Sequence, residues 1–234
     1  MQLFYSATLT AGDTTFVFDK DESRHIIKVL RKSTGDKLHI TNGKGDLFEA
    51  EISLPSDSRC TVRIASVMQF ESPPYSLHLA VAPTKMNERY EWFLEKATEI
   101  GIARITPVIC DRSERKIVKA DRFEKIILSA MKQSGQYFLP VLDEPMDFDD
   151  FAAADFAGQK FIAHCEPTGK ATLKQSLTPN QDVTILIGPE GDFSPKEIQL
   201  ALQNGFVPVS LGETRLRTET AALVACHSVA YANE

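Results

Sequence analysis

One stretch decides the fold of this chain: Ile185-Leu186-Ile187-Gly188-Pro189-Glu190-Gly191-Asp192-Phe193-Ser194-Pro195-Lys196-Glu197. Its aliphatic start is typical of a strand that is buried on both faces. Gly-Pro-Glu-Gly cannot continue the strand, because proline lacks an N–H donor and glycine permits unusual backbone angles. Ser194-Pro195-x-Glu197 then forms a capping box with proline at the first helical position. The stretch therefore predicts a strand, a tight loop and a helix.

A loop of this kind is where open α/β sheets bind ligands, so it is a candidate site for a small molecule. The alternative interpretation is an ordinary strand-to-helix connection. Two motifs that would identify a nucleotide site are missing from the sequence: G-x-G-x-x-G after the first strand, and G-x-x-x-x-G-K-[ST]. The glycine-containing loops instead follow the late strands, at residues 188–191 and 211–213.

Strand-like and helix-like segments alternate from residue 77 onwards. The expected strands are 77–81, 104–109, 161–165, 183–187 and 207–211, and the expected helices are 88–100, a long one from about 121, 195–203 and 218–231. Such alternation predicts an α/β domain with a mostly parallel sheet that helices cover on both faces.

Residues 1–70 have a different pattern of short alternating segments separated by turns. Asn42-Gly43-Lys44-Gly45-Asp46 is typical of a hairpin turn, and a single short helix is expected over residues 22–30. This part predicts a small β-barrel with a helical insert. Because Glu71-Ser72-Pro73-Pro74 is typical of a linker, we divide the chain into 1–70, a linker at 71–76, and 77–234.

Composition excludes several classes of protein. With 43% hydrophobic and 25% charged residues, and no apolar run near the ~20 residues needed to span a bilayer, we expect a soluble globular protein. The start lacks a signal-peptide pattern, and a cytoplasmic location is expected. No cysteine falls in a C-x-x-C pair, so neither a zinc site nor a disulfide framework is indicated, and Cys110, Cys165 and Cys226 are expected to be core thiols.

Net charge is −6, which argues against a general nucleic-acid coat but leaves room for a local basic patch. Four cations recur near the expected helix 22–30 at helix-neighbour spacing: Arg24, Lys28, Arg31 and Lys32. They either bind RNA phosphates or form a solvated helix face. His25 points either with Arg24 towards RNA or into the barrel.

Arg215 and Arg217 precede the expected start of the last helix, where Thr218 is the expected N-cap and Glu219 follows. A positive charge gains nothing from the helix dipole there, so the pair suggests an anionic partner such as a phosphate. The alternative is two solvated loop arginines. His164 and Glu166, at the end of an expected strand, are further candidates to line a site.

Gly188-Pro189-Glu190-Gly191, followed by Leu211-Gly212 and Leu216-Arg217-Thr218-Glu219-Thr220-Ala221, resembles the 16S ribosomal RNA uridine N3-methyltransferases, the small-subunit methyltransferases E of the SPOUT class. The resemblance covers nearly the whole chain. It implies a SPOUT-type trefoil-knotted parallel-sheet α/β domain preceded by a small PUA-like β-barrel that binds RNA. The chain departs from the family pattern twice: Asp192 stands where a glycine is usual, and Gly135-Gln136 where an arginine is usual.

The resemblance also implies S-adenosylmethionine as the methyl donor, no metal, and 16S ribosomal RNA or the small ribosomal subunit as partner of a homodimer formed through the knot domain. It places the donor on Leu186, Ile187, Gly188, Pro189, Glu190, Gly191, Leu211, Gly212, Leu216, Arg217 and Thr220. RNA would contact Arg24, His25, Lys28, Arg31, Lys32 and Arg112.

Methylation of uridine N3 needs an in-line acceptor, a base for the imide proton and an exposed target base. We assign catalysis to Arg217, Arg215 and Glu190: the arginines orient RNA phosphate or uracil oxygens, and Glu190 or Glu219 orients loops or relays the proton. Two alternatives stay open, namely a non-catalytic RNA-binding or ribosome-assembly protein of the same fold, and a SPOUT methyltransferase that acts on another RNA position.

Overall fold

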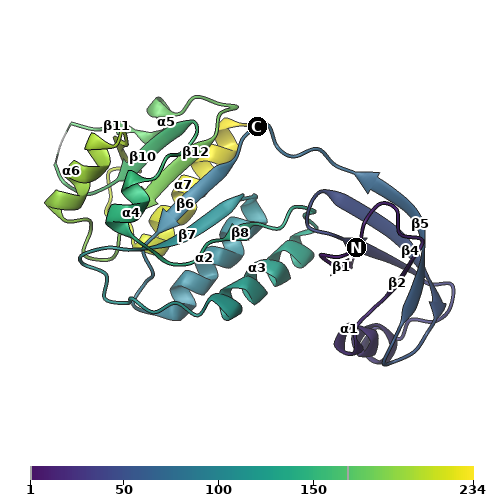
Figure 1. Ribbon diagram of the computed structural model, residues 1–234. Helices are drawn as coiled ribbons and strands as arrows, with labels where there is room; N and C mark the ends of the chain where they lie inside the picture. Colours follow the sequence, from purple (N-terminus) through teal and green to yellow (C-terminus); the bar gives the residue numbers. More distant parts are fainter. Residues whose placement is uncertain (1, 168) are drawn as a thin grey trace. The chain divides into compact units, whose positions relative to one another are not determined.

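The computed structural model describes residues 2–167 and 169–234, and its chain forms two compact units (Figure 1). The first unit consists of Met1–Ser72 and Met131–Leu139, and the second of Pro73–Ala130 and Pro140–Glu234. The boundary after Ser72 lies inside the expected linker, whereas the sequence pattern gave no sign that residues 131–139 belong with the first unit. The assignment of separate functions to 1–70 and 77–234 stays a prediction.

The first unit is built on a five-stranded sheet in the order β1-β3-β4-β5-β2. Its strands are β1 (Leu3–Tyr5), β2 (Thr15–Val17), β3 (Lys37–Thr41), β4 (Asp46–Leu54) and β5 (Thr61–Gln69). All neighbours are antiparallel except β1 and β3. Irregular pairing at two points of β4 bends the sheet around its own core, which includes Phe4, Ile26, Ile40, Phe48 and Val62.

The helical insert of this unit differs in type from the expected single α-helix over 22–30. A short helix α1 (Lys20–Arg24), capped by Asp19, continues into a π-helix, η1 (His25–Val29), and Arg31 follows with a left-handed φ of 55°. A π-helix bonds each residue to the one five further on, so the cations from Arg24 to Lys32 do not share one α-helical face. The expected spacing was therefore wrong, although the insert exists.

The second segment of the first unit, residues 131–139, pairs with the hairpin turn between β3 and β4. Gly45 N donates to Tyr137 O at 3.0 Å, and Leu139 N donates to Gly43 O at 2.9 Å. A Cβ on Gly45 would lie 2.6 Å from the Phe138 ring, and its φ of +97° favours glycine. The glycine of this turn is therefore needed by a chain segment almost a hundred residues away.

The second unit holds an eight-stranded parallel sheet in the order β11-β13-β10-β12-β6-β7-β8, with β9 also beside β7. Its strands are β6 (Leu77–Val81), β7 (Arg104–Ile109), β8 (Val141–Leu142), β9 (Met146–Asp147), β10 (Gln159–Ala163), β11 (Ala171–Thr172), β12 (Val183–Ile187) and β13 (Val207–Ser210). Every residue of β6 and β12 is buried, as the sequence predicted for a doubly covered sheet.

Helices cover both faces of this sheet (Figure 1). They are α2 (Asn87–Ile100), α3 (Ala120–Ser134), α4 (Phe148–Ala153), α5 (Leu173–Ser176), α6 (Pro195–Gln203) and α7 (Thr218–Ala232). One core combines α4 and α6 with the strands around Phe193, whereas α7 packs on β6, β12 and α2. No helix in the described ranges is long and apolar enough to cross a membrane.

Candidate functional site

Three connections meet at the carboxyl ends of the adjacent strands β13, β10 and β12, because parallel strands end at the same edge. They enclose two neighbouring cavities of about 380 and 270 Å³. The larger is lined mainly by residues 209–216, and the smaller by the Gly-Pro-Glu-Gly loop together with residues 215–218. Both cavities share Ala163, Cys165, Arg215, Leu216 and Ala221. We treat them as one divided site.

Thr218 joins the two glycine-containing loops that the sequence singled out. Its hydroxyl Oγ1 donates to Gly188 O at 3.0 Å, and the residue is only 4% exposed. The expected N-cap role of Thr218 was wrong: α7 begins at Thr218, and Arg217 occupies the cap position without a side-chain cap bond. The Thr218 hydroxyl instead connects two loops, and a bond between segments distant in sequence cannot be predicted from local sequence patterns.

Glu190 has one satisfied and one unsatisfied carboxylate oxygen. Oε1 accepts the backbone N–H of Lys85 at 2.9 Å. Oε2 is buried and has no hydrogen-bond partner among the described residues. A buried acceptor without a donor costs about 1–3 kcal/mol. Because Glu190 lines the smaller cavity, a bound ligand is the natural source of that donor.

Side chains from other elements hold this loop on both sides. Arg112 Nη1 donates to Gly191 O at 2.9 Å and to Phe193 O at 3.3 Å, so the contacts of this predicted RNA-binding residue are with the loop. On the other side, Asp192 Oδ2 accepts the backbone N–H of Cys165 at 2.8 Å. Cys165 is exposed at the edge of the site, so its assignment to the core was wrong.

The connection after β10 carried no motif, and the sequence pointed to it only through His164 and Glu166. His164 does line the larger cavity, whereas Glu166 lines neither. Lys170 Nζ holds the connection by donating to the carbonyls of His164 and Glu166 at 2.7 and 2.5 Å. Burial, and next the charge of Lys170, lower the pKa of His164. The lining residues to which the sequence assigned no binding or catalytic role are Ala163, Cys165, Lys170, Asp192, Val209, Ser210, Glu213, Thr214, Thr218 and Ala221.

Most of the predicted donor-binding residues meet at this edge. The cavities are lined by Ile187, Gly188, Pro189, Glu190, Leu211, Gly212, Leu216 and Arg217, together with Arg215. Leu186 is fully buried in the core around Phe193, and neither Gly191 nor Thr220 lines a cavity. The roles of all these residues stay predictions.

The remaining predicted RNA-binding residues belong to the first unit. Arg24, His25, Lys28 and Arg31 are exposed, and Lys32 is half-buried. His25 does not enter the core: its Nε2 lies 3.2 Å from Gln2 Nε2, and its ring edge faces Phe4 with centroids 6.4 Å apart.

Side chains of both charge signs line the divided site. Glu190 and Asp192 line the smaller cavity together with the exposed Arg215 and Arg217, and Arg215 Nη2 donates to Glu190 O at 3.4 Å, while residues 209–216 line most of the larger cavity. In residues 2–167 and 169–234, no three His, Cys, Asp or Glu side chains are grouped so as to hold a metal ion. Because carboxylates and arginines line the same cavity, the site suits an organic ligand that carries both a positive and a negative charge.

Comparisons with known proteins place this site in a family. The family model described as RNA methyltransferase domain matches residues 71–230, and the one described as RNA methyltransferase PUA domain matches residues 18–65. The ribosomal RNA small subunit methyltransferase E of Buchnera aphidicola (subsp. Acyrthosiphon pisum) is 32% identical over 90% of this chain and 85% of its own length.

Two solved structures are similar throughout. A probable rRNA-methyltransferase from Porphyromonas gingivalis has a TM-score of 0.92 and 39% identity, covering 100% of this chain and 98% of that one. The ribosomal RNA small subunit methyltransferase E of Neisseria gonorrhoeae, bound to S-adenosyl methionine, has a TM-score of 0.84 and 28% identity over 97% of this chain and 96% of its own. The predicted α/β fold with a parallel sheet and an N-terminal PUA-like domain is confirmed, and the chain belongs to the RNA methyltransferase family, among the ribosomal RNA small subunit methyltransferases E.

Proposed function

We propose that this chain transfers a methyl group from S-adenosylmethionine to N3 of a uridine in the 16S ribosomal RNA of the small subunit. The observation that carries the proposal is the divided cavity in which Thr218 ties the Gly-Pro-Glu-Gly loop to the loop after β13. The similar protein of Neisseria gonorrhoeae binds this donor. Specificity for uridine N3 rests on the family resemblance, as does the trefoil knot, which stays a prediction.

The residues of the site fit such a donor. The larger cavity falls within the ~300–1,000 Å³ typical of small-molecule sites, and the smaller one adjoins it. The backbone of 211–216 supplies donors and acceptors suited to the edge of an adenine, with the apolar side chain of Leu216 beside them. Gly188 allows close passage of the loop, because a Cβ there would lie 3.1 Å from the Phe193 ring.

The chain's own residues account for the proton and for the developing charge. When bound, the donor supplies a methyl group activated by a sulfonium, which leaves as a neutral thioether. Uridine N3 must lose its proton as it accepts the methyl group, and Glu190 Oε2 is a buried acceptor without a partner among the described residues. Arg217 and Arg215 line the same cavity and stabilise negative charge on the uracil oxygens.

Glu219 is a weaker candidate for the proton relay. It lines neither cavity, and its Oε1 lies 3.8 Å from Arg89 Nε of helix α2. We therefore assign Glu219 to the packing of α7 and assign the proton to Glu190.

The same proposal assigns RNA binding to the first unit. The exposed cations Arg24, Lys28 and Arg31 would contact phosphates, which makes affinity fall as salt rises. A homodimer formed through the second unit and a cytoplasmic location complete the proposal, in line with the resemblance.

The decisive experiment maps the product. Naked 16S RNA and purified small subunits are each incubated with the protein and isotopically labelled donor, and the RNA is analysed by mass spectrometry. We expect one labelled 3-methyluridine with the wild type. With Glu190→Gln, which removes the proton acceptor at nearly constant shape, we expect label to appear about a hundredfold more slowly at saturating donor. Label at another base supports a methyltransferase of different specificity, and absence of donor binding supports the non-catalytic alternative.

A further inference from the structure

Asp192 has an unusual backbone conformation at the edge of the site. Its φ is +62°, a left-handed value that non-glycine residues other than Asn and Asp adopt at a cost of about 1–2 kcal/mol. Its backbone N–H donates to Pro189 O at 2.9 Å, which closes the Gly-Pro-Glu-Gly turn. A glycine would satisfy this backbone more easily, so the side chain is the reason to look for a role.

The Asp192 carboxylate bonds to the connection after β10 through only one of its two oxygens. Oδ2 accepts the backbone N–H of Cys165 at 2.8 Å, which links the ends of β12 and β10. Oδ1 makes no hydrogen bond with any residue that the structure describes. The residue is half-buried and lines the smaller cavity, and Cys165 lines both cavities.

The negative charge of Asp192 acts on its surroundings in this partly enclosed region. It contributes to the raised pKa of the Cys165 thiol, after the larger effect of burial. It also opposes the burial that lowers the pKa of His164. The charge of Asp192 therefore affects the pKa of two groups that line the larger cavity, although Asp192 itself lines the smaller one.

We propose that Asp192 makes the site selective for the positively charged methyl donor over its neutral product. This inference rests on the proposed function. The donor carries a sulfonium charge that the thioether product lacks, so a fixed carboxylate at the cavity stabilises only the donor. An attraction between unit charges of about 1.4 kcal/mol, which is modest for charges near a protein surface, corresponds to about tenfold in affinity.

Asp192→Asn separates charge from geometry. Asparagine tolerates the left-handed conformation, and its amide oxygen still accepts the Cys165 N–H, so only the charge is lost. Asp192→Gly removes both the charge and the hydrogen bond. The matched control is Asp150→Asn, an exposed carboxylate on helix α4 that lines neither of the two cavities.

Binding is measured by calorimetry, without RNA, for three ligands: S-adenosylmethionine, sinefungin, which carries a protonated amine in place of the sulfonium, and S-adenosylhomocysteine. For Asp192→Asn we expect affinity for the two cationic ligands to fall about tenfold, and affinity for the neutral product to change by less than about twofold. Asp150→Asn should match the wild type, and Asp192→Gly should weaken all three ligands.

Two results would overturn the inference while leaving the proposed function intact. Equal losses for all three ligands in Asp192→Asn would make Asp192 a residue that only positions the loop. Unchanged affinities in Asp192→Asn would remove its role in donor selection altogether. If the wild type bound none of the three ligands, the proposed function itself would fail, and this inference with it.

Discussion

The two ends of the parallel sheet in the second unit use charged side chains in opposite ways. At the amino end, His78, Arg104, Thr106 and Asp143 satisfy one another in a closed network. At the carboxyl end, the buried Glu190 Oε2 has no hydrogen-bond partner among the described residues, and the exposed Arg217 lines the same cavity. The network at the amino end therefore stabilises the fold, whereas the charged groups that line the cavity at the carboxyl end are available to bind a ligand.

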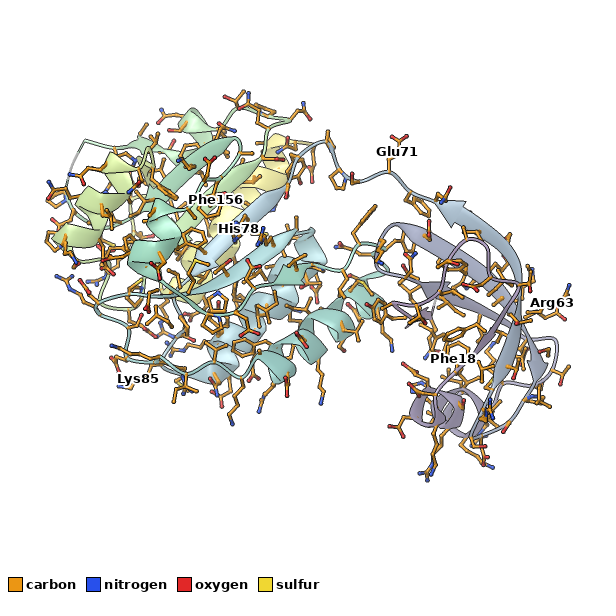
Figure 2. The ribbon with its side chains drawn as sticks, in the orientation of Figure 1. Phe18, Arg63, Glu71, His78, Lys85 and Phe156 are labelled. Carbon is orange, nitrogen blue, oxygen red and sulfur yellow. The ribbon has the colours of Figure 1, made fainter. Side chains whose placement is uncertain are left out.

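The amino-end network consists of hydrogen bonds that end at the buried side chain of His78. Arg104 donates to both oxygens of Asp143 at 2.7 and 2.9 Å, and Thr106 Oγ1 donates to the same carboxylate. His78 Nε2 lies 2.7 Å from Thr106 Oγ1, and the His78 and Phe156 rings form a T-shaped pair with centroids 5.5 Å apart (Figure 2). Burial, and next the charge of Arg104, lower the pKa of His78 to about 4, against the opposing effect of Asp143.

The first prediction is an acid sensitivity of folding at the amino end of the sheet. Because the folded pKa of His78 lies below the ordinary 6.5, the folded state binds fewer protons than the unfolded state between those values. The contribution is present in full above pH 6.5 and is lost as pH falls towards 4. We expect the free energy of unfolding in urea to drop by about 2.5 kcal/mol through this group between pH 7 and 4.5.

His78→Gln is the matched variant, because glutamine can still bond Thr106 Oγ1 but does not titrate. The difference in unfolding free energy between variant and wild type isolates His78 from other acidic groups. A difference that does not change with pH would show that His78 is not held neutral by this network.

The second prediction tests the carboxyl end. For Arg217→Ala we expect single-turnover methylation to fall about a hundredfold, because removal of one group that stabilises developing negative charge typically costs that much. The rate is measured at saturating S-adenosylmethionine, so that a change in donor affinity does not enter it, and the unfolding free energy should stay close to that of the wild type. Lys174→Ala, which removes an exposed cation from helix α5, is the control for net charge. Unchanged methylation in Arg217→Ala would exclude the catalytic role.

The third prediction concerns the link between the two site loops. In Thr218→Val the hydroxyl is lost at nearly constant shape, and Gly188 O loses its donor. We expect about 1.5 kcal/mol less stability, and a loss of donor affinity of several-fold as the loops separate. Thr218→Ser keeps the hydroxyl and should restore donor affinity. Full affinity in the valine variant would mean that the loops are positioned without this bond.

Local patterns in the sequence were enough to predict the parallel sheet and the two glycine-containing loops at its edge. Side-chain periodicity and proline or glycine positions act over a few residues, so such features can be read from the chain. The hydroxyl of Thr218 and the exposure of Cys165 were not readable, because both depend on which strands become neighbours. The same holds for residues 131–139, whose partners Gly43 and Gly45 are distant in sequence.

The smallest expected effect concerns the cap of helix α6, which follows the Gly-Pro-Glu-Gly loop. Ser194 caps α6 by accepting from Glu197 N at 3.3 Å and donates to Asp111 Oδ2 at 2.7 Å, but it lines neither cavity of the site. Loss of a serine cap typically costs about 1 kcal/mol, so Ser194→Ala should lower the unfolding free energy by that amount and leave donor affinity within about twofold. If donor binding instead fell as far as in Thr218→Val, the start of α6 would belong to the ligand site. The cap of α6 would then contribute both to folding and to donor binding, because Ser194 could lower donor affinity only through a coupling of α6 to the Gly-Pro-Glu-Gly loop.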